Sequence, residues 1–244
     1  MRQSRFSGLL FYSMVFLLVS CSGGGNETKA TTDSTAMDTT KAMPAPVVTT
    51  ITTPQNMMVV THKVSNYAKW KASYDEHDSM RLVSGIHSYV IGRGFKDSNM
   101  VMVATKVDDT TKAKAFAKDP SLKKAMQKGG VIGMPTMTLT TMVFQDTANI
   151  SSDLRSRTTF KVKDWATWQK AFEEGKQERL DNGIVVRAYG HELDNDKKVV
   201  LVTAVMDTAK AFSYYKSDML KKRRAESGVI GEPERFLYRV VQLY

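Results

Sequence analysis

The sequence predicts an α+β protein that contains two tandem βαββαβ units, and three observations lead to this prediction. A pattern of residues that begins at Lys63 occurs again at Lys161, 98 positions later. Within each copy, strand-like segments with alternating hydrophobicity are interrupted by two helical ones. The chain has 244 residues, which is enough for two small domains, because domains commonly contain roughly 100–150 residues.

The two copies are similar over most of their length. The first copy begins KVSNYAKWKASYDEHDSMRLVSGI and the second begins KVKDWATWQKAFEEGKQERLDNGI. The same offset relates Gly-Val-Ile-Gly-Met-Pro at 130–135 to Gly-Val-Ile-Gly-Glu-Pro at 228–233. A gap of two residues near Thr110 is the only adjustment needed. Self-similarity at one offset is typical of an internal duplication. We therefore predict a first unit at 56–146 and a second at 156–244, with a polar break between them.

Local signals place six elements in the first copy. A strand is expected over 58–64, and Asn66 is a favoured N-cap for a helix that continues to about Val83 and ends at Gly85. Two strands joined by a hairpin-type turn follow at 86–93 and 100–107. A helix over 111–128 is expected to break at Asp119-Pro120, and a final strand covers 136–144. The Gly-Val-Ile-Gly-x-Pro segments are interpreted as turns. The second copy repeats this order with Asp164 as its N-cap.

The N-terminal segment indicates export and lipidation. Arg2 and Arg5 precede an apolar run at 9–19, which is typical of a secretory signal. This run is shorter than the roughly 20 apolar residues of a transmembrane helix. It ends in Leu18-Val19-Ser20-Cys21, which resembles the lipobox of bacterial lipoproteins, in which the cysteine is lipidated and becomes the mature N-terminus. The alternative is a secreted protein with an unpaired thiol. Because the chain has one cysteine, no disulfide is possible within it.

The lipobox resemblance implies a location in the cell envelope. Residues 1–20 would be the signal peptide, and 21–55 would be the lipidated cysteine and a flexible linker rich in Gly, Thr, Ser, Ala and Pro. The membrane would be a partner through the lipid on Cys21. Ser22 follows the cysteine, and under envelope-sorting rules this resemblance points to the outer membrane.

The element order, together with an aromatic-x-x-His-x-x-x-Arg helix and a late Gly-Val-x-Gly-x-Pro, resembles the dimeric α/β-barrel superfamily. This superfamily includes the antibiotic-biosynthesis monooxygenases. In it, two ferredoxin-like units pair their sheets into a barrel with helices outside. The resemblance covers both copies from Met58 onward and implies that one chain supplies both halves, as a monomer with an intramolecular pseudo-dimer. The fold hosts monooxygenases, isomerases, haem enzymes and simple binders, so it does not define the activity.

Candidate site residues come from one helix face and one strand face. Intervals of 3, 4, 3 and 4 place five side chains on one side of the first helix: Tyr67, Trp70, Tyr74, His77 and Arg81. On the second strand, one face would line the barrel interior and carries His87, Tyr89, Ile91 and Arg93. If they converge, a site for an anionic or phenolic ligand would form from His77, Arg81, His87 and Tyr89. Alternatively, the aromatics pack on the sheet, the arginines interact with the helix end and the strand residues fill the barrel.

The sequence offers little support for a metal, a cofactor or nucleic acid. No HxxH, HxH or HExxH pair is formed by the four histidines, His62, His77, His87 and His191. We therefore expect no metal site and no cofactor. The formal charge is +10, but the basic residues alternate with acidic ones along the predicted helices, and no nucleic-acid-binding motif is present.

Three functions remain open at this stage. The preferred one is an envelope-anchored lipoprotein that binds a small, partly apolar or anionic ligand in a barrel pocket. The second is an enzyme that resembles the cofactor-independent monooxygenases, with His77 or His87 as base. The third is a structural or interaction lipoprotein with a filled barrel. Binding is preferred because Gly175 replaces His77 in the second copy, whereas the arginine and the aromatic positions are kept.

We predict that Cys21→Ser abolishes lipidation, because the thiol is the only acyl acceptor at the cleavage site. Labelling of cells with a radioactive fatty acid, followed by detergent partitioning, measures this. The wild-type chain should carry the label and enter the detergent phase. A substituted chain that still carries lipid and fractionates with membranes would contradict the anchor assignment.

Overall fold

The structure is a computed structural model that describes residues 49–244. The predicted signal segment, the lipidation site at Cys21 and the linker up to residue 48 lie outside the described residues. The described residues all belong to one structural unit. They contain the same succession of strands and helices twice, preceded by one short additional strand.

The first half comprises β1 (Thr50–Ile51), β2 (Gln55–Val64), α1 (Tyr67–Glu76), α2 (Asp78–Val83), β3 (Ile86–Gly94), β4 (Met100–Val107), α3 (Thr110–Phe116), α4 (Pro120–Lys128) and β5 (Val131–Asp146). The second half comprises β6 (Leu154–Val162), α5 (Trp165–Glu174), α6 (Lys176–Asp181), β7 (Ile184–Glu192), β8 (Asn195–Val205), α7 (Thr208–Lys216), α8 (Asp218–Glu226) and β9 (Val229–Leu243). β1 lies in the predicted linker and pairs with the end of β5.

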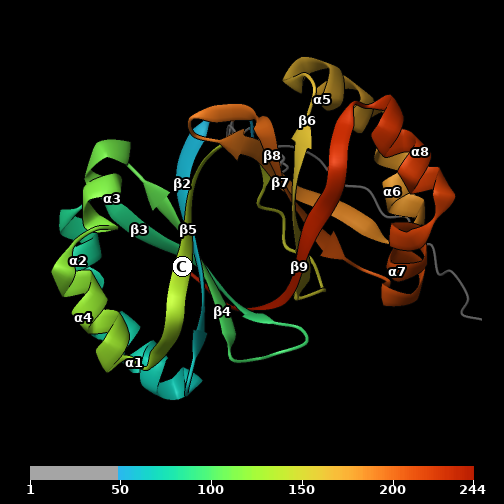
Figure 1. The fold of residues 1–244 in the computed structure, drawn as a ribbon. Helices are drawn as coiled ribbons and strands as arrows, with labels where there is room; N and C mark the ends of the chain where they lie inside the picture. The colour runs from blue at the N-terminus through green and yellow to red at the C-terminus, as the bar shows by residue number, and fades with distance from the viewer. Residues whose placement is uncertain (1–48) are drawn as a thin grey trace, which may run out of the picture. The chain divides into compact units, whose positions relative to one another are not determined.

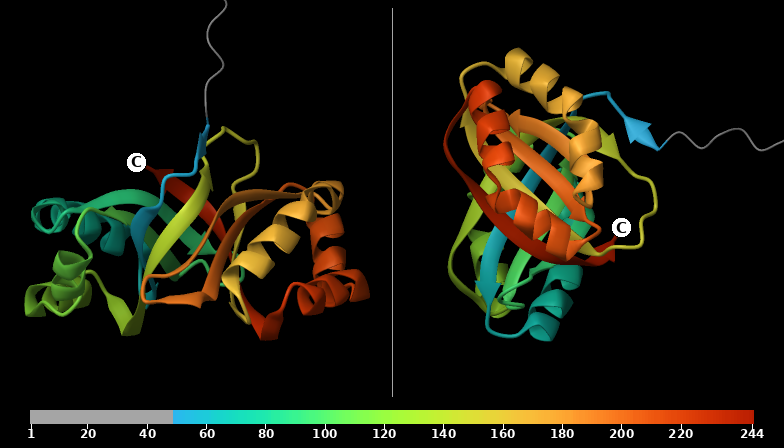
Figure 2. Two further views of the ribbon diagram at one scale, coloured as in Figure 1. Left: turned by 90° about the horizontal axis from the view of Figure 1, so that it is seen from above. Right: turned by 90° about the vertical axis from the view of Figure 1, so that its right-hand side faces the viewer.

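The strands form one closed antiparallel barrel. In the first half the strand order is β5-β2-β4-β3, and in the second half it is β9-β6-β8-β7. Two junctions join the halves, because β3 pairs with β9 and β5 pairs with β7. The α1–α4 helices cover one side of the barrel and α5–α8 the other (Figure 1; Figure 2, left). This confirms the predicted fold class, in which two ferredoxin-like units pair into an intramolecular α/β barrel.

A glycine lies at each junction, where the two halves approach closely. A Cβ built on Gly190 of β7 would lie 2.0 Å from the carbonyl oxygen of Thr141 on β5. At the other junction, a Cβ on Gly92 of β3 would lie 2.2 Å from the ring of Tyr238 on β9. Gly92 and Gly190 are 98 positions apart. Because only glycine lacks a Cβ, both junctions depend on this residue for their close contact.

The helix ends follow from local signals, with one exception. The side chain of Asn66 accepts a hydrogen bond from the backbone N–H of Lys69 at 2.9 Å, as its N-cap role predicts. The break before Pro120 is also confirmed, and Asp119 caps the new helix. The predicted continuous helix from Asn66 to Val83 is wrong, however. It is interrupted at His77, where ψ is 21°, and a second helix starts at the next residue.

The sequence suggested that the Gly-Val-Ile-Gly-x-Pro segments are turns, and this holds only for the first glycine of each, Gly130 and Gly228. The other residues are irregular parts of long strands. In β5 the register to β2 shifts between Thr61 and Lys63, and Gly133 and Pro135 lie in the extra stretch opposite His62. Gly133 has a φ of 73°. A bulge accepts a proline because its residues do not take part in the regular hydrogen bonds between the strands. The backbone N–H that proline lacks is therefore not needed there. The same shift occurs in the second half, between β6 and β9.

The apolar cores lie mainly between the barrel wall and the helices. In the first half they include Ile86 and Val64, which are fully buried, and in the second half Val162 and Val199. None of the helices within residues 49–244 combines the length and the hydrophobicity that a membrane crossing requires.

Gly190→Ala should lower the free energy of unfolding by about 1–3 kcal/mol, because the added methyl group overlaps with backbone that cannot rotate away. Chemical denaturation in urea measures this loss. Gly129→Ala is the control, since φ there is −70° and the nearest atoms to the new Cβ are 3.3 Å away. Equal stability of the two variants would contradict the role of Gly190 in barrel closure.

Candidate ligand-binding cavities

The barrel encloses a cavity of about 300 Å³. On one side its wall consists of Met57 and Val59 of β2, together with Tyr89 of β3. On the other side lie three arginines, namely Arg155 and Arg157 of β6 and Arg187 of β7. One end of the cavity is bordered by the loop at 146–150 and by the C-terminal residues Leu243 and Tyr244.

Two β-bulges decide which residues enter this cavity. In β3 the pairing with β4 shifts between Ser88 and Val90, so that Tyr89 and Val90 both border the cavity. The predicted simple alternation is therefore wrong beyond this point. Ile91 packs with Trp70 on the helix side, and the Arg93 guanidinium lies 4.2 Å from the ring of Tyr67. A bulge inserts one extra residue and so reverses the faces of every residue that follows.

The second half has the same bulge in β7, between Val186 and Ala188. It directs Arg187 and Ala188 into the cavity. Tyr189 and His191, which correspond to Ile91 and Arg93, also lie on the helix side. Tyr189 packs against Trp168, and the His191 ring lies 5.0 Å from that of Trp165.

Two of the three arginines in the cavity have partners in the protein. Arg187 donates to the carboxylate of Asp146 at 3.0 Å and to the carbonyl oxygen of Ala148 at 2.7 Å. Nη1 of Arg155 donates to the carbonyl oxygen of Ser152 at 2.7 Å. These bonds fix the loop that follows β5 against the barrel mouth. Burial lowers the pKa of Arg155, and the nearby positive charge of Arg187 acts in the same direction.

Arg157 differs from both, because its guanidinium has no hydrogen bond or ion pair with the described residues. Its Nε is buried without a partner. Burial lowers the pKa of Arg157, and the charges of Tyr238, Glu192 and Glu234 act in the opposite direction. Glu192 is itself paired with Lys198. A half-buried cation without a partner is unfavourable, so Arg157 is the clearest sign of a ligand-binding role in the barrel.

Two tyrosines supply hydroxyl groups in the same cavity. Tyr238 is 3% exposed, and burial raises its pKa to about 12. Burial also raises the pKa of Tyr89, and Nζ of Lys106 lies 4.9 Å from the centre of the Tyr89 ring. Both phenols stay protonated at neutral pH and act as hydrogen-bond donors or acceptors.

A second, smaller cavity of about 70 Å³ lies between α1, α2 and the sheet. It is bordered by His77 and Arg81, and by several methionines, among them Met58 and Met126. His77 Nδ1 lies 2.7 Å from the carbonyl oxygen of Ser73. Because a carbonyl oxygen only accepts, Nδ1 carries the proton.

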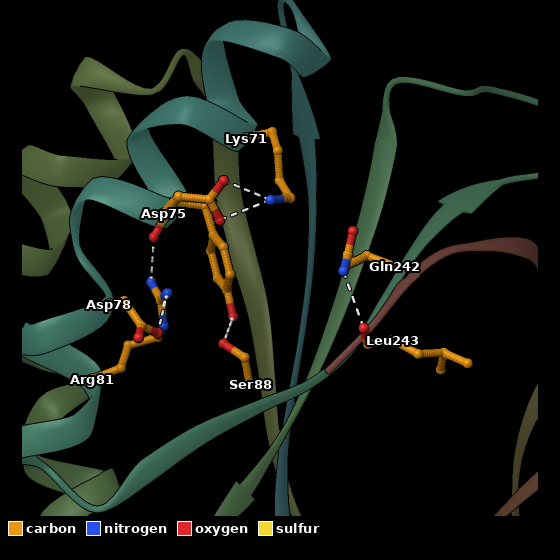
Figure 3. Close-up of polar contacts among 8 residues, drawn as sticks. Lys71, Asp75, Asp78, Arg81, Ser88, Gln242 and Leu243 are labelled. Atoms are coloured by element: carbon orange, nitrogen blue, oxygen red, sulfur yellow. Dashed lines mark hydrogen bonds and ion pairs between the residues drawn. The ribbon is translucent and has the colours of Figure 1, made fainter.

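Arg81 is held firmly by its own helix pair (Figure 3). Nη1 donates to the carbonyl oxygen of Tyr74 at 2.7 Å, and Nη2 donates to the carboxylate of Asp78 at 2.9 Å. The guanidinium also lies 3.6 Å from the centre of the Tyr74 ring, whose hydroxyl bonds Ser88 at 2.7 Å. The bond to the Tyr74 carbonyl satisfies a backbone acceptor in the last turn of α1, next to the helix break at His77.

Arg179 repeats this arrangement in the second half. Nη1 donates to the carbonyl oxygen of Phe172 at 2.5 Å, and the guanidinium lies 3.8 Å from the Phe172 ring. Burial lowers the pKa of Arg179 to about 10. The two arginines are 6% and 7% exposed. Their shared role is therefore structural, as one of the two sequence-based interpretations proposed.

The four residues predicted to form the site do not converge. His77 and Arg81 border the helix-side cavity, whereas Tyr89 borders the barrel cavity. His87 lies in neither, and its Nε2 bonds the exposed carboxylate of Asp108 at 2.7 Å. A single small ligand cannot contact all four. Whether the helix-side cavity around His77 and Arg81 binds a ligand stays a prediction.

Sequence reasoning did not single out Arg155 and Arg157. The signal was present, because Arg155-Ser156-Arg157 alternates within a strand-like segment and places both arginines on one face. It also missed the burial of His62. Both ring nitrogens of His62 lack partners among the described residues, and burial lowers its pKa to about 4. Phe160 occupies the corresponding position of the second half. Within residues 49–244 no three His, Cys, Asp or Glu side chains are grouped so that they could hold a metal ion.

Comparisons with known proteins agree with the architecture. No family model matches the chain, and no curated protein matches its sequence. Among solved structures, it resembles a candidate monooxygenase from Fusobacterium nucleatum, with 12% identity and a TM-score of 0.52 over 78% of this chain and 93% of the other. It also resembles an anthrone oxidase-like protein, with 14% identity and a TM-score of 0.53 over 78% and 92%.

A candidate chlorite dismutase is similar to the same degree, with 14% identity and a TM-score of 0.52 over 78% of this chain and 96% of the other. At these identities the likeness concerns the fold alone. The class is therefore that of α+β proteins with the dimeric α/β-barrel fold. In this chain one polypeptide supplies both halves of the barrel.

Arg81→Met should lower the free energy of unfolding by about 1–3 kcal/mol, because it leaves the Tyr74 carbonyl and the Asp78 carboxylate without a buried partner. Arg179→Met should cause a similar loss. Urea denaturation measures both. The exposed Lys124→Met on α4 is the control, and a loss within about 0.5 kcal/mol for Arg81→Met, as at ordinary surface positions, would contradict the structural role.

Proposed function

We propose that this chain is an envelope-anchored lipoprotein that binds a small, partly apolar or anionic molecule inside its barrel. The observation that carries the proposal is the barrel cavity of about 300 Å³, which has apolar walls and a few polar groups. Cavities of this size and composition are typical of small-molecule sites. Of the four predicted site residues, Tyr89 alone borders this cavity.

The anchoring part of the proposal rests on the sequence. A lipobox that ends at Cys21 and a long polar linker would tether the barrel to a membrane, and Ser22 favours the outer membrane. The binding site would then be displayed at the cell envelope, where the linker allows the barrel to reach its ligand independently of the anchor.

The duplicated sequence supports an origin of the barrel from two copies of one unit. In a dimer of identical chains, both sides of the barrel interior carry the same residues. In a single chain the two sides are free to differ. Here Met57, Val59 and Tyr89 lie on one side, and the residues 98 positions later are Arg155, Arg157 and Arg187. This difference favours one asymmetric ligand.

The enzymatic alternative has less support from the geometry. Among the described residues that border the barrel cavity, none is a histidine, and the carboxylate of Asp146 is bonded to Arg187. His77 and His87, which the monooxygenase-like hypothesis used as bases, lie outside this cavity. The third alternative, a barrel filled by side chains, does not fit a cavity of this volume.

Ala188→Phe should weaken binding of N-phenyl-1-naphthylamine, a neutral fluorescent probe of apolar sites, by at least about tenfold, because the ring fills the cavity. Fluorescence titration of the mature chain, carrying Cys21→Ser to prevent acylation, measures this. Ala104→Phe, on the opposite wall, should have the same effect. Each tenfold change corresponds to about 1.4 kcal/mol of binding free energy.

Ala115→Phe is the matched control, because Ala115 is exposed on α3 and the substitution leaves the barrel unchanged. Thermal unfolding of each variant verifies that the barrel is intact. Unchanged probe affinity in two folded cavity variants, or no probe binding by the wild-type chain, would contradict a ligand site in the barrel.

A further inference from the structure

We propose that the ligand of the barrel is an amphiphilic anion, such as a medium-chain carboxylate, whose charged group binds at Arg157, next to Arg155 on the same face of β6, and whose apolar part lies against Met57 and Val59. This inference rests on the proposed function, because it names the chemical class of the molecule that the barrel binds.

The first argument is the charge in the cavity. Three guanidinium groups border it, and the one acidic side chain among the described residues that line it is that of Asp146, which is already paired with Arg187. The remaining positive charge comes from Arg155 and Arg157. An anion that enters the cavity therefore meets two cations whose charge the lining residues do not neutralise, in surroundings that exclude much of the screening water.

The second argument is the state of Arg157. Arg81 and Arg179 are buried, and each donates to a carbonyl oxygen of its own helix pair. Arg157 is half-buried, with its Nε shielded from solvent. Arg157 makes no such bond with the described residues. A guanidinium has five donors in a planar fork that matches a carboxylate. Arg157 thus offers the barrel interior a preformed, unused set of anion-binding groups.

The third argument is the position of the apolar groups. The arginines all come from β6 and β7, and the apolar wall includes Met57, Met102 and Met142 of the first half. Methionine side chains adapt to irregular apolar shapes. A free inorganic anion would use one side of the cavity and a hydrocarbon would use the other. A molecule that contains both parts would use the whole cavity.

Isothermal titration of the mature chain with four probes tests this inference. Octanoate carries both the negative charge and the apolar chain. Octan-1-ol has the chain without the charge, octylammonium has the chain with a positive charge, and acetate has the negative charge without a long apolar chain. Octanoate should bind at least about tenfold more tightly than octan-1-ol, since hydrogen bonds to charged groups contribute this much or more. Octylammonium and acetate should bind more weakly still.

Arg157→Met should abolish the preference for octanoate over octan-1-ol, and Arg157→Lys should keep part of it. Arg93→Met is the control, because Arg93 lies on the helix side of β3 and does not border the cavity. This variant should keep the full preference. Without ligand, Arg157→Met should also raise the melting temperature, because it removes an unpaired, half-buried charge, whereas a structural arginine would lower it.

The outcomes separate this inference from the proposed function. Equal affinity for octanoate and octan-1-ol would overturn the role of charge and leave the barrel as a binding site. Acetate that binds as tightly as octanoate would overturn the role of the apolar wall. A retained preference in Arg157→Met would overturn the assignment of the anion to that residue. If neither octanoate, octan-1-ol nor the naphthylamine probe binds, the proposed function itself fails.

Discussion

Closure of the barrel is the constraint on which the other features depend. A four-stranded half would leave β3 and β5 with unpaired backbone groups, which are open to pairing with other chains. Each of these edges instead pairs with the other half, at β3–β9 and β5–β7. The glycines Gly92 and Gly190 allow this close approach. Because both halves belong to one chain, closure needs no second subunit.

Closure also determines what the side chains on each face of the sheet contact. Residues that point outward meet helices and form the apolar cores, and residues that point inward meet the opposite wall of the barrel. The matched arginines Arg81 and Arg179 serve the outer layer, where each binds a carbonyl oxygen at a helix break. Their retention in both copies reflects a structural need that both copies share. It therefore carries no information about a ligand.

The inner face is where the two copies differ. The helix-side packing is similar in both halves, since Trp70 and Trp168 occupy matching positions over the sheet. In the barrel, by contrast, Val59 corresponds to Arg157 and Tyr89 to Arg187. A buried charge opposes folding unless something compensates for it. In the proposal above, the anionic group of the ligand supplies this compensation.

The sequence by itself determined the repeat, the order of the elements, the helix caps at Asn66 and Asp164 and the break at Pro120. These features depend on residues close in the chain, so periodicity and capping rules suffice to predict them. Only the tertiary structure decided which residues face the cavity. Bulges at Tyr89 and Arg187 reverse the faces of β3 and β7, and a bulge depends on the register with neighbouring strands. This is why Ile91 and Arg93 lie on the helix side. His77 and Arg81 are separated from Tyr89 because the sheet lies between the helix-side cavity and the barrel cavity, and His87 bonds Asp108 near the start of β3. Which face of a strand a helix covers depends on long-range packing, which no local signal in the chain predicts.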